Sequence, residues 1–188
     1  GGSACALLVV VFNWNPYLSL IVATLAGMAA GAITGLLHTK LKIPPILAGI
    51  LTMISLYSIN LRIMGQSNTP FLRNKSTIIS IIKDLLPSAK ELGMKDSTLQ
   101  ILVVIALGLL FSALMIGFLY WFFGTEIGSA IRATGNNEAM VRAQGGNTSK
   151  YIIIGLIVSN GLIALSGALV AQSQGYADVS MGVGAIVI

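Results

Sequence analysis

The chain has 188 residues, of which 55% are hydrophobic and only 9% are charged, and its mean hydropathy is +0.89. Soluble domains carry about a quarter charged residues, so a water-exposed globular domain is excluded. The formal net charge is +5, but the basic residues are scattered and never form a run. Such scattered charges are typical of loops that flank a membrane and argue against a nucleic-acid partner.

Residue types that usually carry catalysis or bind metals are scarce. The single cysteine, Cys5, lies in apolar sequence and cannot form a disulfide within the chain. One histidine and six acidic residues, most of them in expected loops, give no cluster of nucleophile, base or metal ligands. The pattern G-x-x-x-x-G-K-[ST], whose backbone holds phosphates, does not occur. The sequence therefore predicts no enzyme, no catalytic or metal site, and no cofactor held by this chain.

Apolar stretches in chain order predict membrane spans. Residues 3–12 are too short to cross, and because the chain begins without Met and ends in apolar sequence, we interpret them as a partial span of a longer protein. Runs of about 20 apolar residues can cross a ~30 Å hydrocarbon layer as helices. Such runs cover residues 17–37, 43–65, 99–123 and 151–171. We therefore expect an all-α integral membrane protein, a polytopic helical bundle forming one transmembrane domain over residues 1–188.

Three glycines of the first full span share one helix face. Gly27, Gly31 and Gly35 are spaced four residues apart, which gives two overlapping small-xxx-small motifs. Small residues let another helix approach closely in lipid, so we favour helix packing over a substrate-lining role.

Polar residues near two of the spans are candidates for a solute pathway. They are Tyr57, Ser58 and Asn60 in the later half of 43–65, and Gln172, Gln174 and Asp178 after the last full span. Residues 172–188 start too polar and glycine-rich for a lipid-facing helix, so an interrupted element near a pathway and an ordinary loop are both open. In the long loop 66–98, apolar residues at helical spacing predict a short amphipathic helix over 76–86.

A polar segment, residues 124–150, separates two strongly apolar spans. Thr125 can cap a first short helix, which we expect Gly135 to break. Either Asn136 or Asn137 can cap a second helix of about seven residues.

The second helix has favourable charges at both ends. Glu138 lies in its first turn and Arg142 in its last, at a spacing that allows an ion pair, and Gly145-Gly146 supplies the stop. Isolated helices this short are marginal in water, so the capping suits a helix that fits into a groove on another protein. A merely well-formed loop is equally consistent with the chemistry. The basic residues of the loops are balanced between the two sides, so charge does not decide which side this segment occupies.

The polar segment resembles the cytoplasmic coupling loop of permease subunits of bacterial ABC importers, the group that includes branched-chain amino-acid and ribose permeases. The resemblance rests on IRATGNNEAMVRAQGGNTSKY (131–151), on residues 34–65 and on residues 159–188, in that order along the chain. It covers most of the chain, and within the group the chain looks most like the aromatic amino-acid branch. The positions expected to contact an ATPase are Arg132, Ala133, Gly135, Asn137, Glu138, Arg142, Ala143 and Gly145.

The resemblance implies a multi-pass protein of the bacterial plasma (inner) membrane. Two permease subunits would form the pathway, a separate ATP-binding subunit would hold the ATP and dock on residues 124–150, and an extracytoplasmic binding protein would deliver the solute. The solute is expected to be small and polar, an amino acid first, with a sugar or nucleoside as alternatives. The rival function is an ion-coupled secondary transporter, which usually carries intramembrane acids or histidine. Asp178 is the only deep candidate for such a role.

Overall fold

The computed structural model describes residues 1–10, 15–70 and 96–181, without the side chains of Val10, Thr69 and residues 96–100. The amphipathic helix expected over 76–86 lies outside these residues. So do the end of the expected partial span 3–12 and the last part of 172–188.

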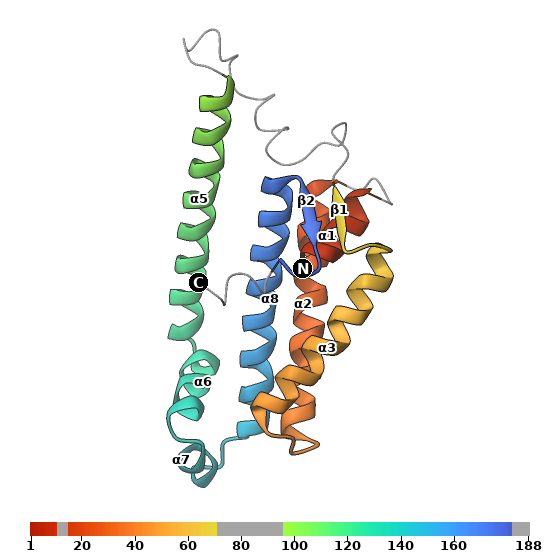
Figure 1. The fold of residues 1–188 in the computed structure, drawn as a ribbon. Helices are drawn as coiled ribbons and strands as arrows, with labels where there is room; N and C mark the ends of the chain where they lie inside the picture. Colours follow the sequence, from red (N-terminus) through yellow and green to blue (C-terminus); the bar gives the residue numbers. More distant parts are fainter. Residues whose placement is uncertain (11–14, 71–95, 182–188) are drawn as a thin grey trace.

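The described part of the chain consists of helices joined by short connections (Figure 1). In chain order the elements are α1 (Gly2–Val10), α2 (Pro16–Thr39), α3 (Pro45–Met64), β1 (Asn68–Pro70), α5 (Asp96–Gly124), α6 (Glu126–Asn136), α7 (Glu138–Ala143), α8 (Thr148–Gln174) and β2 (Tyr176–Asp178). By length and composition, α2, α3, residues Ile101–Gly124 of α5, and α8 are able to cross a membrane. The expected all-α polytopic class is confirmed, with β1 and β2 forming only a small antiparallel pair.

Proline and glycine set several of the helix ends. Pro16 and Pro45 occupy the first positions of α2 and α3, where a missing backbone N–H costs no helical hydrogen bond. Gly65 and Gly175 follow α3 and α8 with φ of 71° and 74°, the left-handed conformation that glycine adopts without strain.

α8 is longer than the span expected over 151–171. The helix continues to Gln174, so the interruption expected from residue 172 onward starts at Gly175 instead. The polar Gln172 is accommodated in this helix because its side-chain amide is buried and donates hydrogen bonds to α2 instead of facing lipid. Beyond Gly175 the chain pairs with the segment after α3, with Asn68 opposite Asp178.

α2 and α8 lie in very close contact along the glycine face of α2. A Cβ placed on Gly31 would lie 2.3 Å from the carbonyl oxygen of Leu156, and one on Gly27 would lie 2.2 Å from the Cβ of Ala164. At Gly35 the nearest atoms belong to Ile153, at 3.1 Å. The glycine face of α2 therefore lies directly on α8, at a separation that only small residues allow.

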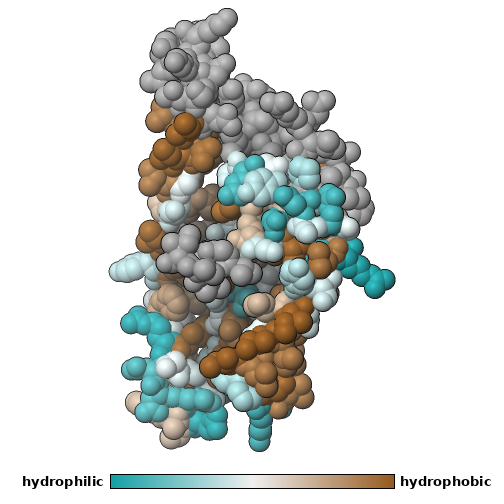
Figure 2. All heavy atoms as spheres, viewed as in Figure 1, coloured by the Kyte–Doolittle hydropathy of each residue, from teal (hydrophilic) through white to brown (hydrophobic). Residues whose placement is uncertain are grey.

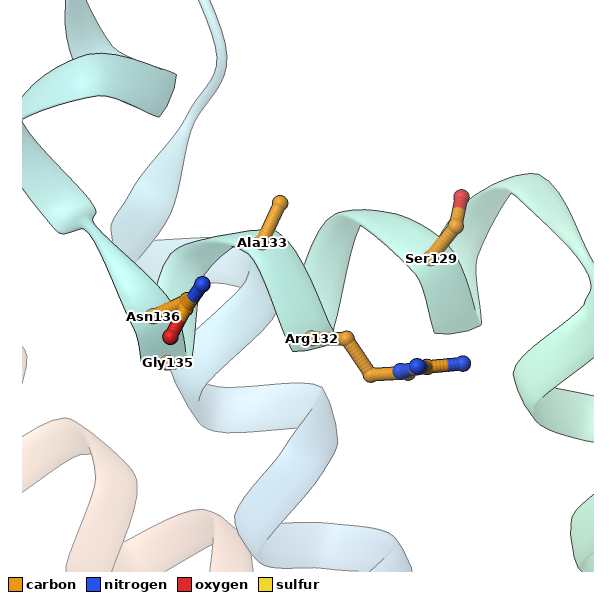
Figure 3. Close-up of a pocket in the computed structure, with 5 residues that line it drawn as sticks. All are labelled: Ser129, Arg132, Ala133, Gly135 and Asn136. Atoms are coloured by element: carbon orange, nitrogen blue, oxygen red, sulfur yellow. The ribbon is translucent and has the colours of Figure 1, made fainter.

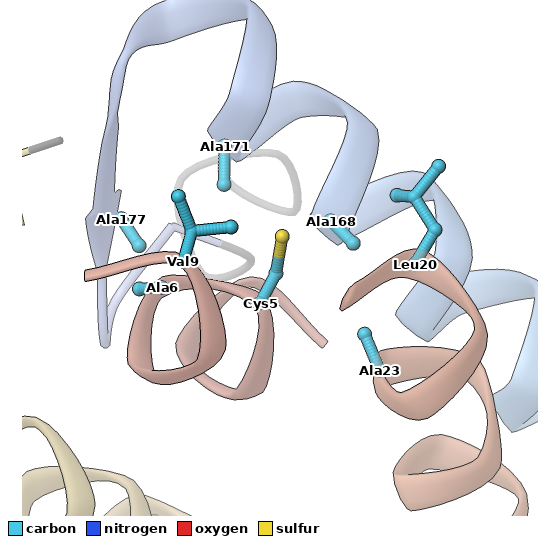
Figure 4. Close-up of a cluster of buried hydrophobic side chains, with 8 residues drawn as sticks. All are labelled: Cys5, Ala6, Val9, Leu20, Ala23, Ala168, Ala171 and Ala177. Carbon is cyan, nitrogen blue, oxygen red and sulfur yellow. The ribbon is translucent and has the colours of Figure 1, made fainter. Parts of the chain in front are cut away.

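A compact cluster of apolar side chains, most of them small, holds the elements together at the end of the molecule opposite α7 (Figures 1 and 4). It is contributed by α1, α2, α8 and β2, and consists of Cys5, Ala6, Val9, Leu20, Ala23, Ala168, Ala171 and Ala177. Elsewhere large apolar side chains are exposed along α3 and α5, which Figure 2 shows as hydrophobic surface. Such large apolar surfaces suit a protein whose spans face lipid or other membrane helices.

Candidate functional site

The polar segment 124–150 folds into two short helices at one end of the molecule (Figure 1). Thr125 caps the first of them, α6, because its hydroxyl accepts a hydrogen bond from the backbone N–H of Gly128 at 3.2 Å. A Cβ on Gly128 would lie 2.1 Å from the carbonyl oxygen of Phe122, so glycine permits the sharp turn from α5 into α6.

One face of α6 packs on α8 and the other is free. The Cγ2 of Ile131 lies 3.4 Å from a Cβ built on Gly155, and Thr134 is buried with its hydroxyl donating to the Ala130 carbonyl. Arg132 and Ala133 are exposed. α6 therefore rests on a membrane-spanning helix while presenting a polar surface outward.

The prediction that Gly135 breaks the first helix is wrong. α6 continues through Gly135 to Asn136. Glycine inside a helix costs about 1 kcal/mol relative to alanine, but it retains its N–H and can adopt helical dihedral angles. The helix ends instead at Asn137, whose extended backbone (φ −153°, ψ 94°) redirects the chain into α7.

α7 is capped as the sequence indicates. The side-chain oxygen of Asn137 accepts a hydrogen bond from the backbone N–H of Met140 at 3.0 Å. Glu138 in the first turn and Arg142 in the last form an ion pair, and both charges are favourable with respect to the helix dipole. Gly145 ends the turn with φ of 83°.

The ion pair of α7 has a third member on α8. The hydroxyl of Thr148, the first residue of α8, donates to Glu138 Oε1 at 3.0 Å and accepts from Arg142 Nη2 at 3.2 Å. Thr148 is only 3% exposed.

An open hollow of about 600 Å³ lies along the free face of α6 (Figure 3). Ser129, Arg132, Ala133, Gly135 and Asn136 line it. In Figure 3 the Arg132 side chain extends along the helix at one side of the hollow, away from α8. Because Ala133 and Gly135 are small, the space beside them stays open, and the guanidinium of Arg132 supplies a positive charge.

The structure places the expected docking residues on α6, on α7 and at their joint with α8. Arg132, Ala133 and Gly135 line the hollow, whereas Ala143 and Gly145 are exposed at the far end of α7. Two features of this segment were not predicted from the sequence, namely an exposed apolar side chain on α7 and a contact between α7 and α8. Met140 is 56% exposed on α7, and its apolar character within a polar segment was a usable signal. The contact made by Thr148 depends on how α7 folds back onto α8, and no sequence signal predicted it.

The pathway candidates fall into two groups that the structure does not join. Tyr57 and Ser58 are exposed on α3, and Asn60 is half-buried. Gln174 is exposed at the end of α8, and Asp178 accepts a hydrogen bond from the N–H of Ser180 at 2.6 Å. Among the hydrogen bonds of the described residues, none connects the two groups.

Gln172 belongs to the contact between α1, α2 and α8 rather than to an open surface. It is 4% exposed, and its Nε2 lies 3.2 Å from Ser19 Oγ, 3.2 Å from the Pro16 carbonyl and 3.3 Å from Cys5 Sγ. Within the part of the chain that the structure describes, its Oε1 has no hydrogen-bond partner. No group of three His, Cys, Asp or Glu side chains able to hold a metal occurs in residues 1–10, 15–70 and 96–181.

Comparisons with known proteins agree with one another. The chain is 39% identical over 174 residues to the tyrosine transport system permease protein of Clostridioides difficile (strain R20291), covering 93% of this chain and 52% of that protein. It is 33% identical over 170 residues to an uncharacterized protein of Rickettsia prowazekii (strain Madrid E), covering 90% of this chain and 54% of that protein. The chain thus spans about half the length of these curated relatives.

The third relative is more distant. An uncharacterized protein of Mycoplasma genitalium (strain ATCC 33530) is 26% identical over 163 residues, covering 86% of this chain and 49% of that protein. No solved structure matches. The whole chain, residues 1–188, matches the family described as the branched-chain amino acid transport system permease component. The chain therefore belongs to this family of transport permeases.

Proposed function

We propose that the chain is part of the membrane-spanning subunit of an ATP-driven importer, and that α6 and α7 dock a separate ATPase subunit. The observation that carries this proposal is the construction of the polar segment. Both helices are capped, one side packs on α8, and the other presents a hollow with a positive charge. A loop that merely joined two spans would need neither the caps nor a free, shaped face.

The ATP would be held by the partner, since the chain lacks a phosphate-binding loop. ATP binding would draw two ATPase subunits together and displace the docked helices. The spans would then shift between outward-open and inward-open states, because the nucleotide-bound ATPases favour one of them. A second permease subunit and an extracytoplasmic binding protein would complete the transporter in the plasma (inner) membrane of a bacterium.

The solute we propose is an amino acid. The family and the name of the Clostridioides difficile relative both concern amino-acid transport. Polar but uncharged residues among the pathway candidates, such as Tyr57, Ser58 and Asn60, suit a neutral or zwitterionic solute better than a strongly charged one. We propose these three with Gln174 and Asp178 as pathway residues. The side-chain amide of Gln172 is buried against α2, so of the six candidates Gln172 is the least suited to line the pathway.

The test is to fill the hollow on α6. We expect Ala133→Trp in the full-length protein, co-expressed with its ATPase subunit, to reduce co-purification of that subunit in detergent by about ten-fold, since an indole excludes a close partner surface. Gln174→Trp places the same indole at an exposed helix residue at the opposite end of the molecule, and it should leave co-purification unchanged.

The outcome against the proposal is equally specific. An ATPase subunit that never associates with the wild type, together with uptake driven by an ion gradient in the absence of ATP, would identify an ion-coupled transporter instead.

A further inference from the structure

The Glu138–Arg142 ion pair on its own cannot hold α7 in place. Both residues belong to α7, so their contact stiffens that helix without linking it to another element. Both are also well exposed, with side-chain exposures of 45% and 69%, and exposed pairs of this kind contribute little.

Thr148 turns this local pair into a connection between two helices. Arg142 Nη2 carries two N–H donors, one for Glu138 Oε1 and one for Thr148 Oγ1. The single hydroxyl proton of Thr148 is then free to be donated to Glu138 Oε1. Each of these three protons has one acceptor, and both hydrogen bonds of the threonine are to charged groups, which makes them stronger than neutral ones.

The backbone between α7 and α8 is a poor mechanical link. It runs through Gly145 and Gly146, and Gly145 has the positive φ that glycine supplies. Gly146 is bound back to α7 through its N–H, which donates to the Val141 carbonyl at 2.9 Å. Asn147 caps α8 itself through the N–H of Lys150, so it does not connect α8 to α7. Among the side-chain hydrogen bonds of the described residues, those of Thr148 are the ones that join α7 to α8.

The next contact along the chain makes this connection matter. α8 lies against α2 along the Gly27, Gly31 and Gly35 face, without room for adjustment at Gly31. A displacement of α8 at its Thr148 end is therefore passed directly to a second span.

We infer that Thr148 is a positioning residue that transmits the displacement of α7 to α8. It does not itself bind the ATPase, because it is buried beneath the pair formed by Glu138 and Arg142. This inference rests on the proposed function. It assigns the part of the energy coupling that passes through α7 to a single buried hydroxyl group, while α6 has its own contact with α8 through Ile131.

The test compares Thr148→Val with Thr148→Ser in the full-length transporter, reconstituted in vesicles with its ATPase subunit and binding protein. Val keeps the shape of Thr and removes the hydroxyl, whereas Ser keeps the hydroxyl. We expect Val to leave ATPase co-purification and basal ATP hydrolysis unchanged and to lower the amino acid imported per ATP hydrolysed by about five-fold or more, as the loss of hydrogen bonds to charged groups implies. Thr148→Ser should keep the wild-type ratio of amino acid imported to ATP hydrolysed.

A merely structural role would change protein yield and thermal stability without changing the uptake per ATP. If Thr148→Val accumulates poorly, Thr148→Ser and Thr148→Ala, which differ from each other only in the hydroxyl, decide the same question. If the ATPase still binds and the variants without the hydroxyl import as much amino acid per ATP as the wild type, the role of Thr148 is overturned. Absence of ATPase binding to the wild type overturns the proposed function itself.

Discussion

Gly31 meets the backbone of α8 rather than a flexible side chain. The nearest atoms to a Cβ at this position are the carbonyl oxygen and carbon of Leu156, at 2.3 and 2.9 Å. A backbone group in a helix cannot rotate away, so relief would require α2 and α8 to separate. Spacing along the sequence indicated that the three glycines share a face. The partner helix and the degree of contact follow only from the folded structure.

We therefore expect Gly31→Ala to destabilise the protein. Alanine favours a helix by about 1 kcal/mol over glycine. Overpacking of a close contact costs about 1–3 kcal/mol, and an overlap with backbone lies at the upper end. The overlap should win, lowering the thermal unfolding temperature in detergent. Gly35→Ala should have a smaller effect, because its nearest neighbour lies at 3.1 Å.

Gly49→Ala is the matched control, because it also lies in a membrane-spanning helix and has nothing within 4 Å. It should be neutral or slightly stabilising. Equal losses at positions 31 and 49 would mean that the α2–α8 contact is not what makes glycine necessary.

Among the elements, α7 was predictable from local sequence and the end of α6 was not. A short helix bounded by Asn137 and Gly145 needs only residues within reach of its own ends, and such cap signals can be read from sequence. Gly135 does not by itself decide where α6 ends, because glycine is tolerated in either a helix or a turn. Packing of α6 on α8 through Ile131 favours the helix, and that contact is not visible in the sequence.

The two glycines should consequently respond to alanine in opposite ways. Gly135→Ala should stabilise α6 by up to about 1 kcal/mol, since the position is helical and has nothing within 4 Å. Gly145→Ala should destabilise the α7–α8 connection by about 1 kcal/mol, because its φ of 83° is unfavourable for a side chain. Protease resistance of the segment and thermal unfolding would measure both. Gly145→Asn should cost less than Gly145→Ala, and a stabilising Gly145→Ala would contradict the assigned conformation.

At the scale of the whole molecule, the structure separates two ends that the sequence could not assign to sides. α6 and α7 lie at one end together with the α2–α3 connection, and β1 and β2 lie at the other (Figure 1). Counting basic residues did not decide the orientation, because the expected loops balance. Within the described residues, the helical class and the four long apolar helices were predictable, since long apolar runs must satisfy their backbone groups as helices in lipid. How the spans pair depends on contacts between distant residues, as between α2 and α8.

The proposed orientation, with α6 and α7 in the cytoplasm, makes a labelling pattern that can be checked. In a background of the full-length protein from which Cys5 and any other cysteine have been removed, Gln66→Cys, Lys40→Cys and Ala139→Cys each place one thiol at an exposed position. A single crossing by α3 separates Gln66 from Lys40. A membrane-impermeant maleimide should therefore label Gln66→Cys in right-side-out vesicles and the other two only in inverted vesicles. Lys40→Cys serves as the internal control, because it shares an end with α7 but lies outside the docking surface. Should Ala139→Cys be labelled from outside together with Lys40→Cys, no cytoplasmic ATPase could reach α7, and the polar segment would have to face the extracytoplasmic binding protein instead.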